Sequence, residues 1–400
     1  MKKTLDIALV GGGSSAHVLI PILSRAGHRI SLLSSRPEQW GRDIKMEVRN
    51  SNNVPIREEH GTLSAVSDDP AEVIPNRDII LLCMPVHQYR KALQRIAPYL
   101  DRNAPVCVGC IYGQAGVNWM MREVIREYGL QNMTYFSFGL LPWICRTLEY
   151  GHSGINYGPK KVNVAAVFPR ERFAWLNENF LSDVCFNYFG CGEVREAENF
   201  LSLTLSVDNQ IIHPCRCYGL QKVYGGRWKE QDDVPYFYRD FDDTSADIMR
   251  VIDNEYSEIR RGIIRKYPEM NFQFMLNYLD LEHLSYQSCN KNIKESFVMS
   301  ETLRQIKLPV VLQNGYWRFD VTHRFFTDDI NYGLCIAKWF GDQLGIATPM
   351  IDEILLWAKA IREESYCVEG KLQISETDLQ TFKYGIPPSY GIESLAAAVQ

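Results

Sequence analysis

A glycine turn near the start of the chain constrains the fold more than any other feature. The apolar run Leu5–Val10 is followed by Gly11, Gly13 and Ala16 in the spacing G-x-G-x-x-A. After a strand and before a helix, the first glycine permits a tight turn, the second lets the backbone approach a pyrophosphate, and the helix start attracts the phosphates. A glycine-rich turn without a ligand is the alternative, but this context favours dinucleotide binding. The residues predicted to contact the cofactor here are Gly11, Gly13, Ser14, Ser15 and Ala16.

The second apolar run, Arg29–Leu33, bears on which dinucleotide binds. NAD-binding domains usually place an acidic residue about 20 residues beyond the glycines, where it binds the ribose hydroxyls. Here Ser34, Ser35 and Arg36 follow the run, and no acid precedes Glu38. Two hydroxyls and a guanidinium suit a 2′-phosphate, so we predict that NADP (as NADPH) is preferred. Stacking of Arg36 on adenine is the alternative reading, and it leaves NAD (as NADH) open.

The first half of the chain alternates short apolar runs with helical patterns. Further strands are predicted at 78–84, 104–110, 134–138 and 161–168, and helices at 16–26, 86–100 and 115–128. This alternation indicates an α/β Rossmann domain, with a doubly wound and mostly parallel sheet. The segment 45–65 has the pattern of short polar strands, and we expect it to be an excursion from the sheet.

The pattern changes after about Val194. Long helical patterns at 197–218, 244–267, 330–344 and 349–364 predict a mainly α-helical second domain. In the last of these, Met350, Ile354, Trp357 and Ile361 form the expected apolar stripe. Because one core rarely exceeds roughly 250–300 residues, a chain of 400 residues is expected to form two domains. We predict an NAD(P)-binding Rossmann domain over 1–193 and a substrate and catalytic domain over 194–400.

Charge, hydropathy and cysteine usage narrow the class of protein. The net charge is −5 without a run of like charges, so we expect no nucleic-acid partner. No signal segment precedes the first strand, and no stretch approaches the about 18 apolar residues of a membrane span, so no membrane association is expected. The 11 scattered cysteines predict buried reduced thiols in a cytoplasmic protein. Their spacings do not predict a metal site.

A histidine in the second half is the first candidate for chemistry. His213 precedes Pro214 within a helical pattern, and the proline cannot donate to the carbonyl of Gln210. A bend at this point would aim His213 into a cleft. A hydrogen-bonded core histidine is an equally good interpretation of the residues alone.

A polar segment ahead of the helix at 330–344 is the second candidate. Asp328 and Asp329 precede that helix and are, on periodicity alone, most simply read as its caps. Arg324, earlier in the same segment, has the plain alternative of an exposed surface charge.

Taken together, these motifs resemble those of the opine dehydrogenases of the octopine type. The similarity runs through nearly the whole chain as spaced motifs: the glycine loop, Gln114-Ala115-Gly116, residues 141–146 (LPWICR), His213-Pro214, residues 324–330 (RFFTDDI) with Gly333-Leu334, and Thr348-Pro349 with its tryptophan helix. Each motif is weak alone, and their order and spacing make the set fairly specific.

The resemblance implies a reductive condensation in a cleft between the two domains. An α-keto acid and the amino group of an amino acid or related amine form an imine, which NAD(P)H reduces. The family assigns the acid/base to the position of His213 and its orienting carboxylate to that of Asp329. The position of Arg324 binds a substrate carboxylate, with Gln114 and Trp143 as further substrate contacts. The oligomeric state is left open, with a homodimer as one option.

Three positions depart from the family pattern. Gly139 stands where octopine enzymes carry an acid, His323 replaces an asparagine, and Asn331 replaces a proline. These departures bear on the substrate more than on the reaction, and an opine enzyme that makes a metallophore stays open. Two rival classes also stay open: a 2-keto-acid reductase of the ketopantoate type, which would use a lysine acid, and a non-catalytic NAD(P)-sensing regulator, which would need an effector surface.

Overall fold

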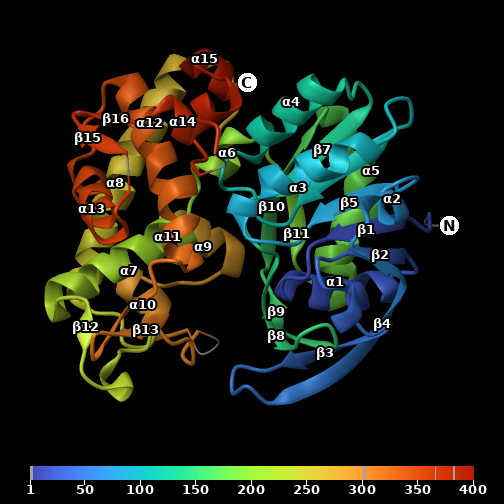
Figure 1. Cartoon of the computed structure of the whole chain (residues 1–400), viewed down its shortest axis with the longest axis horizontal. Coiled ribbons are helices and arrows are strands. Elements are labelled where there is room, and N and C mark those ends of the chain that lie inside the picture. Colours follow the sequence, from blue (N-terminus) through green and yellow to red (C-terminus); the bar gives the residue numbers. More distant parts are fainter. Residues whose placement is uncertain (1–2, 301–302, 365, 382) are drawn as a thin grey trace. The chain divides into compact units, whose positions relative to one another are not determined.

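The computed structural model describes residues 3–300, 303–364, 366–381 and 383–400. The chain separates into two compact units (Figure 1). The first comprises Met1–Thr204 with Leu284–Gln287, and the second comprises Leu205–His283 with Ser288–Gln400. The predicted domain boundary at 193/194 lies earlier in the chain than this division.

An 11-stranded sheet, in the order β11-β10-β7-β6-β5-β1-β2-β4-β3-β9-β8, organises the first unit. Its strands are β1 (Asp6–Val10), β2 (Arg29–Leu33), β3 (Asp43–Arg49), β4 (Pro55–Ser67), β5 (Ile79–Leu82), β6 (Val106–Cys110), β7 (Met133–Phe138), β8 (Trp143–Glu149), β9 (Ser153–Pro159), β10 (Val162–Phe168) and β11 (Glu193–Glu196). The central strands from β7 to β4 all pair in parallel. The predicted Rossmann architecture with a mostly parallel sheet is therefore confirmed.

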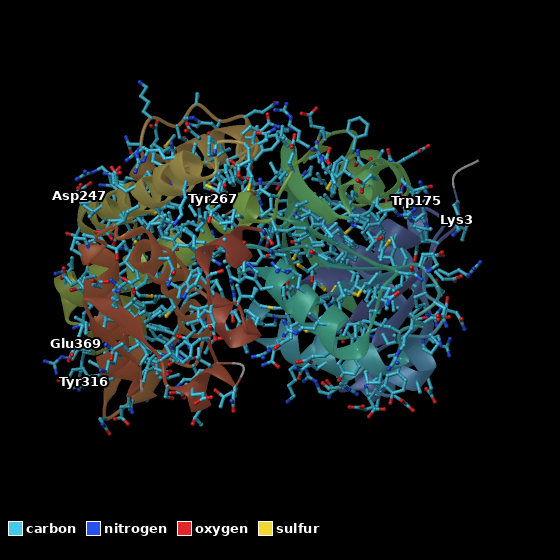
Figure 2. The ribbon with its side chains drawn as sticks, turned by 90° about the horizontal axis from the view of Figure 1, so that it is seen from above. Lys3, Trp175, Asp247, Tyr267, Tyr316 and Glu369 are labelled. Carbon is cyan, nitrogen blue, oxygen red and sulfur yellow. The ribbon has the colours of Figure 1, made fainter. Side chains whose placement is uncertain are left out.

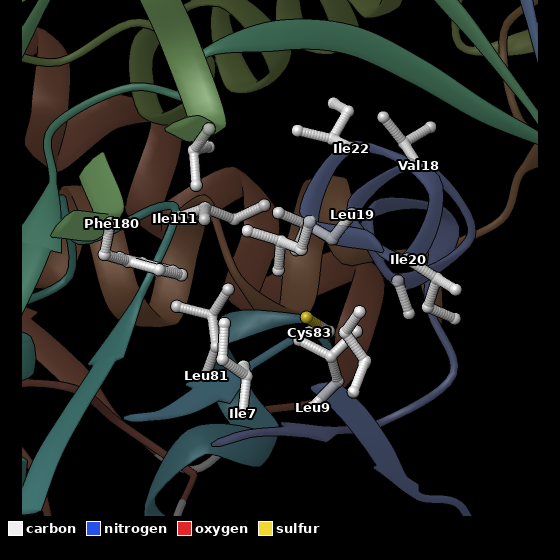
Figure 3. Close-up of a cluster of buried hydrophobic side chains, with 14 of the residues drawn as sticks. Ile7, Leu9, Val18, Leu19, Ile20, Ile22, Leu81, Cys83, Ile111 and Phe180 are labelled. Carbon is white, nitrogen blue, oxygen red and sulfur yellow. The ribbon is translucent and has the colours of Figure 1, made fainter. Parts of the chain in front are cut away.

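The central strands are buried on both faces, which explains why they read as continuous apolar runs. On one face, Ile7, Leu9 and Leu81 belong to the same cluster as side chains of α1 (Ser14–Arg25) and Phe180 (Figure 3). The alternate residues of the same strands are buried too. Elsewhere in this unit, α3 (Tyr89–Ile96) packs against α4 (Val117–Tyr128), and α4 packs against β7.

The segment predicted as an excursion is in fact part of the sheet. The first part of β4, residues 55–62, pairs antiparallel with β3, and its last part, residues 63–67, pairs in parallel with β2. The sheet then continues from β3 through β9 to β8, two strands that the sequence analysis did not predict. Ile44, Met46 and Val48 bury one face of β3, while the other residues of the strand are at least partly exposed, which gives it its polar character.

Helices dominate the second unit. They are α7 (Asn209–Tyr224), α8 (Asp243–Lys266), most of α9 (Tyr278–Tyr286), α10 (Ile293–Val298), α11 (Arg324–Thr327), α12 (Cys335–Leu344), α13 (Pro349–Arg362), α14 (Glu376–Leu379) and α15 (Leu395–Val399). The long helix α8 packs against α7, α12 and α13. A small sheet of β12 (Arg227–Trp228), β14 (Tyr316–Phe319) and β13 (Val310–Gln313) and a hairpin of β15 (Cys367–Glu369) and β16 (Lys371–Gln373) complete the fold. The prediction of a mainly helical second domain is confirmed.

Two details of the predicted helices were wrong. The predicted helix 197–218 is interrupted, because α6 (Leu201–Thr204) ends before α7 begins, where the Asp208 side chain accepts a hydrogen bond from the Asn209 amide. The buried face of α13 consists of Ile351, Ile354, Leu355 and Ala358. The predicted stripe shares only Ile354 with it, because the helix buries a face turned slightly from the one that its largest side chains mark.

Exposed charged side chains such as Lys3, Asp247 and Glu369 project outward from the ribbon (Figure 2). Among the helices in the described part of the chain, none is long and apolar enough to span a bilayer.

Candidate active site

The glycine loop lies at the carboxyl end of β1 and packs against the end of β5. Gly11 has a positive φ of 99°, and a Cβ there would lie 2.9 Å from the Cys83 carbonyl oxygen. A Cβ on Gly13 would lie 2.7 Å from the same oxygen, to which the Gly13 amide donates at 3.1 Å. Larger residues would therefore push the loop away from the sheet, so both glycines are needed for this path.

The loop geometry fits a dinucleotide pyrophosphate. Gly13 is the N-cap of the 12-residue helix α1 and offers no side-chain cap, and the first turn carries no acidic residue. Such a helix start offers backbone amides and a positive dipole end to an anion. The neighbours of β1 in the sheet are β2 on one side and β5 on the other, which makes this the point where the strand order reverses. Dinucleotides bind at this point in doubly wound sheets.

The turn between β8 and β9 contacts the glycine loop, which the sequence analysis did not predict. A Cβ on Gly12 would lie 2.6 Å from the Tyr150 hydroxyl. The Ser14 hydroxyl lies 3.0 Å from that of Thr147, so it is already hydrogen-bonded within the protein. The fully buried His17 connects the two elements, since its Nδ1 bonds the Gly13 carbonyl and its Nε2 accepts from the Gly151 amide.

The residues predicted to select the cofactor follow β2. The buried Ser34 accepts a hydrogen bond at its hydroxyl from the Arg36 amide, at 3.2 Å. Ser35 and Arg36 are exposed, and the Arg36 guanidinium lies 4.1 Å from the centre of the Tyr150 ring. The aromatic ring thus holds the guanidinium close to the glycine loop. No sequence spacing connects Arg36 with Tyr150, so the contact could be found only in the fold.

Two other predicted substrate contacts are core residues in this structure. Gln114 is fully buried and accepts a hydrogen bond from the Tyr112 hydroxyl at 2.9 Å. Trp143 is also buried, and its indole N–H donates to the Val184 carbonyl at 3.1 Å. Both side chains therefore support the first unit, and their contact with substrate stays a prediction.

The second unit joins the two polar candidates into one buried pair. His213 on α7 and Asp329 after α11 are 116 residues apart in sequence, and their Nδ1 and Oδ2 atoms lie 2.6 Å apart. Both side chains are at most 2% exposed. The other ring nitrogen, Nε2, lies 3.1 Å from the Tyr238 hydroxyl, a partner that the sequence analysis missed. The imidazole also stacks on the Phe325 ring at 3.7 Å between centroids.

Asp329 is placed by an unusual turn. It precedes the π-helical turn Ile330–Leu334 and makes no side-chain cap hydrogen bond, so the capping interpretation was wrong for Asp329. Such wide turns often mark functional sites. Burial raises the pKa of the Asp329 carboxyl well above its usual value, and the positive charge of Arg324 opposes this rise. The contact with His213 opposes this effect of burial, because a protonated imidazole beside Asp329 stabilises the ionised carboxylate.

Arg324 begins α11, and its charge acts on the pair. Its side chain is partly exposed, so it can reach a ligand while remaining electrostatically coupled to Asp329. His323 accepts the cap hydrogen bond from the Phe325 amide at its Nδ1. Burial and the Arg324 charge lower the pKa of His323 to about 4, so it is neutral near pH 7.

Gly139, the position without the family acid, is buried beside another residue. A Cβ there would lie 3.2 Å from Cδ2 of Leu203. The Leu203 side chain therefore occupies part of the space that a side chain at position 139 would need. Glu149, the next acidic residue along the chain, is exposed at the end of β8.

Two family models match the chain, one over each part. The N-terminal model of NAD-dependent glycerol-3-phosphate dehydrogenase matches residues 6–137. The model for the alpha-helical domain of NAD/NADP octopine/nopaline dehydrogenase matches residues 196–362, which include His213, Arg324 and Asp329.

Known proteins match over nearly the whole length. Octopine dehydrogenase of Pecten maximus is 25% identical, with 98% of both chains covered. Tauropine dehydrogenase of Arabella iricolor is 22% identical over 97% of this chain and 98% of its own. A solved octopine dehydrogenase structure with NADH and L-arginine aligns with a TM-score of 0.80 at 22% identity, covering 99% of this chain and 98% of that one. Together, these matches support an opine dehydrogenase-like family for this chain.

As an opine dehydrogenase-like protein, the chain is an NAD(P)-dependent oxidoreductase. The resemblance stated from the motifs is thereby confirmed. The octopine/nopaline dehydrogenase model covers His213 and Asp329, so the buried pair lies within the matched region.

Proposed function

We propose that this chain is an NAD(P)H-dependent opine dehydrogenase that joins an α-keto acid to the amino group of an amino acid or related amine. The observation that carries the proposal is the buried pair of His213 and Asp329 in the helical domain. The condensation releases water and forms an imine, and a hydride at its carbon and a proton at its nitrogen then reduce it to a secondary amine. When bound, the nicotinamide cofactor supplies the hydride.

His213 is the proposed proton donor and acceptor. Asp329 binds Nδ1, so Nε2 is the nitrogen that exchanges protons with the substrate. The carboxylate fixes the ring orientation and stabilises the imidazolium form, as a carboxylate does for a catalytic histidine. Loss of water from the condensed substrates needs a proton at the departing oxygen, and the imidazolium supplies it. The Tyr238 hydroxyl lies on the side of the ring from which Nε2 would donate that proton.

Arg324 is the proposed binding residue for the keto acid's carboxylate. A guanidinium holds a carboxylate through two parallel hydrogen bonds. Its partial exposure leaves the group accessible. The same charge faces Asp329, so a bound anion at Arg324 would also alter the charge balance of the catalytic pair.

The cofactor preference is part of the proposal. Solved relatives include one with NADH and another, yersinopine dehydrogenase, with NADP+. In this chain Gly11 and Gly13 would hold the pyrophosphate, and Ser34, Ser35 and Arg36 favour NADPH through a 2′-phosphate. The position of Arg36 on the Tyr150 ring supports this choice, because the guanidinium is held where β2 ends.

The amine is proposed to be neutral or apolar, and arginine a poor substrate. A buried guanidinium needs an anionic partner, because leaving that charge unpaired costs several kcal/mol. Gly139 offers no acid, and Leu203 lies beside it. Catalytic efficiency for arginine should therefore be below that for alanine, phenylalanine and methionine with a saturating small keto acid such as pyruvate. If arginine were the best substrate, another residue would have to supply the acid.

The proposed reaction is tested by NADPH oxidation over pairs of keto acids and amines. Oxidation should require both partners. Equal oxidation by a keto acid alone would instead identify a simple keto-acid reductase.

A further inference from the structure

The departure at Asn331 gains a reason from the structure. Its Oδ1 accepts a hydrogen bond from Nη1 of Arg362 at 2.8 Å, and its Nδ2 donates to the Lys383 carbonyl at 3.2 Å. The Asn331 backbone carbonyl also accepts from the Gly385 amide at 3.1 Å. A proline could make neither side-chain contact. Asn331 thus fastens the segment after Asp329 to α13 and to the C-terminal part of the chain.

Arg362, the last residue of α13, binds on both sides of Asp329. The Nη1 that donates to Asn331 also donates to the Phe326 carbonyl at 3.2 Å. One guanidinium nitrogen therefore connects a residue before Asp329 with a residue after it. Such a contact restricts how far the intervening backbone can move.

Glu364 holds the guanidinium in this orientation. Its Oε1 lies 2.8 Å from Nη2 of Arg362, and both side chains are less than 10% exposed. The other oxygen, Oε2, binds Lys383 and accepts from the Tyr384 hydroxyl at 2.9 Å. Every charge in this buried group thus has a partner, as low-dielectric surroundings require.

We call Arg362 and Asn331, which hold the backbone on both sides of Asp329, the bracket. The contact that the bracket would preserve is the hydrogen bond between His213 and Asp329. At 2.6 Å between Nδ1 and Oδ2, it allows little displacement of Asp329. Arg324, Asp328 and Asp208 also act on Asp329 electrostatically, and Tyr238 bonds the far side of His213.

We propose that Arg362 and Asn331 are positioning residues that hold Asp329 against His213. The expected loss of turnover rests on the proposed function. The expected shift of the His213 pKa rests on the His213–Asp329 contact alone. Without the bracket, Asp329 moves away from the imidazole and stabilises the imidazolium less. The proton donor then loses its proton at lower pH. Misplacement of about 1 Å can cost about a hundredfold in rate.

The test compares Arg362→Met and Asn331→Ala with Arg260→Met. Arg260 is another arginine of the second unit whose side chain is less than 10% exposed, and it pairs with Asp253 rather than with the Asp329 segment, so it controls for loss of a buried ion pair. We expect both bracket variants to lower kcat about tenfold to a hundredfold with little change in KM. Their falling limb in the pH–rate profile should move about one unit to lower pH, and the control should move neither quantity. The double variant should add little to either single effect, because both residues act on one segment.

The His213 ring is also titrated by NMR in each folded variant without substrate. The proposal expects a lower pKa of the imidazole in Arg362→Met and Asn331→Ala. An unchanged titration in both folded variants would overturn the positioning role, whatever the substrate is. Absence of amine-dependent turnover in the wild type would overturn the proposed function instead, and the titration would still decide this inference. If Arg362→Met does not fold, Asn331→Ala gives the answer alone.

Discussion

The glycine loop of the first unit and the histidine–aspartate pair of the second are built on opposite principles. The loop requires glycines, which have no side chain, since a Cβ on Gly11 or Gly13 would clash with the Cys83 carbonyl oxygen. The pair depends on two side chains that lie 2.6 Å apart from distant parts of the chain. The loop offers backbone amides for binding, whereas the pair offers a mobile proton. Variants of the two regions should therefore damage different kinetic constants.

The largest effect is expected when the imidazole of the catalytic pair is removed. His213→Ala should lower kcat by about 100- to 10,000-fold, because general acid–base catalysis typically contributes that much. NADPH affinity, measured by fluorescence titration, should stay at the wild-type value. If His213 were only a core residue, the variant would lose stability and keep its rate per folded molecule.

Gly11→Ala should show the reverse pattern. The positive φ of 99° and the close Cys83 carbonyl mean that alanine displaces the loop, so the Kd for NADPH should rise about tenfold or more. Gly129→Ala is the matched control, since Gly129 also has a positive φ, of 66°, but has no atom within 4 Å of an added Cβ. Equal NADPH affinity in both variants would mean that the loop is not the pyrophosphate site.

The cofactor preference gives a smaller effect within the first region. Arg36→Ala should weaken NADPH binding by about tenfold, the worth of a charge-assisted contact of about 1.5–3 kcal/mol, and leave NADH nearly unchanged. Arg42→Ala removes another exposed arginine of the same unit and should change neither cofactor's affinity. Equal affinities of the wild type for the two cofactors would contradict the NADP preference.

These two regions also differ in how far sequence could predict them. The loop is local, so its spacing predicted both the turn and the helix start. The pair was found by resemblance, because periodicity alone favoured a cap for Asp329 and left His213 undecided. Tyr238 and Arg362 were missed because neither has a fixed spacing from the residues it contacts. The strands β8 and β9 were missed because β9 joins the sheet by pairing with β3, and no local sequence pattern predicts a pairing between such distant segments.

The smallest expected effect concerns stability near the catalytic segment. The pKa of His323 is lowered to about 4 in the folded protein, so the unfolded chain binds more protons between that pH and about 6.5. The contribution of His323 to the free energy of unfolding is therefore complete above about pH 6.5 and is lost as the pH falls towards 4. Because the side chain is partly exposed, we expect this loss to be about 1–2 kcal/mol. His323→Asn keeps a capping side chain without the titration. Denaturant unfolding at several pH values should show a shallower decline for this variant, and equal declines would contradict the assignment.

The central claim is that the His213–Asp329 pair serves the reduction of an imine rather than of a free keto acid. The direct measurement is the mass of the product formed from pyruvate, a neutral amino acid and NADPH. The account predicts one product whose mass equals the sum of the two acids less water plus two hydrogens, formed by the wild type and almost absent with folded Asp329→Asn. Lactate as the main product, with the amino acid left unchanged, would contradict it.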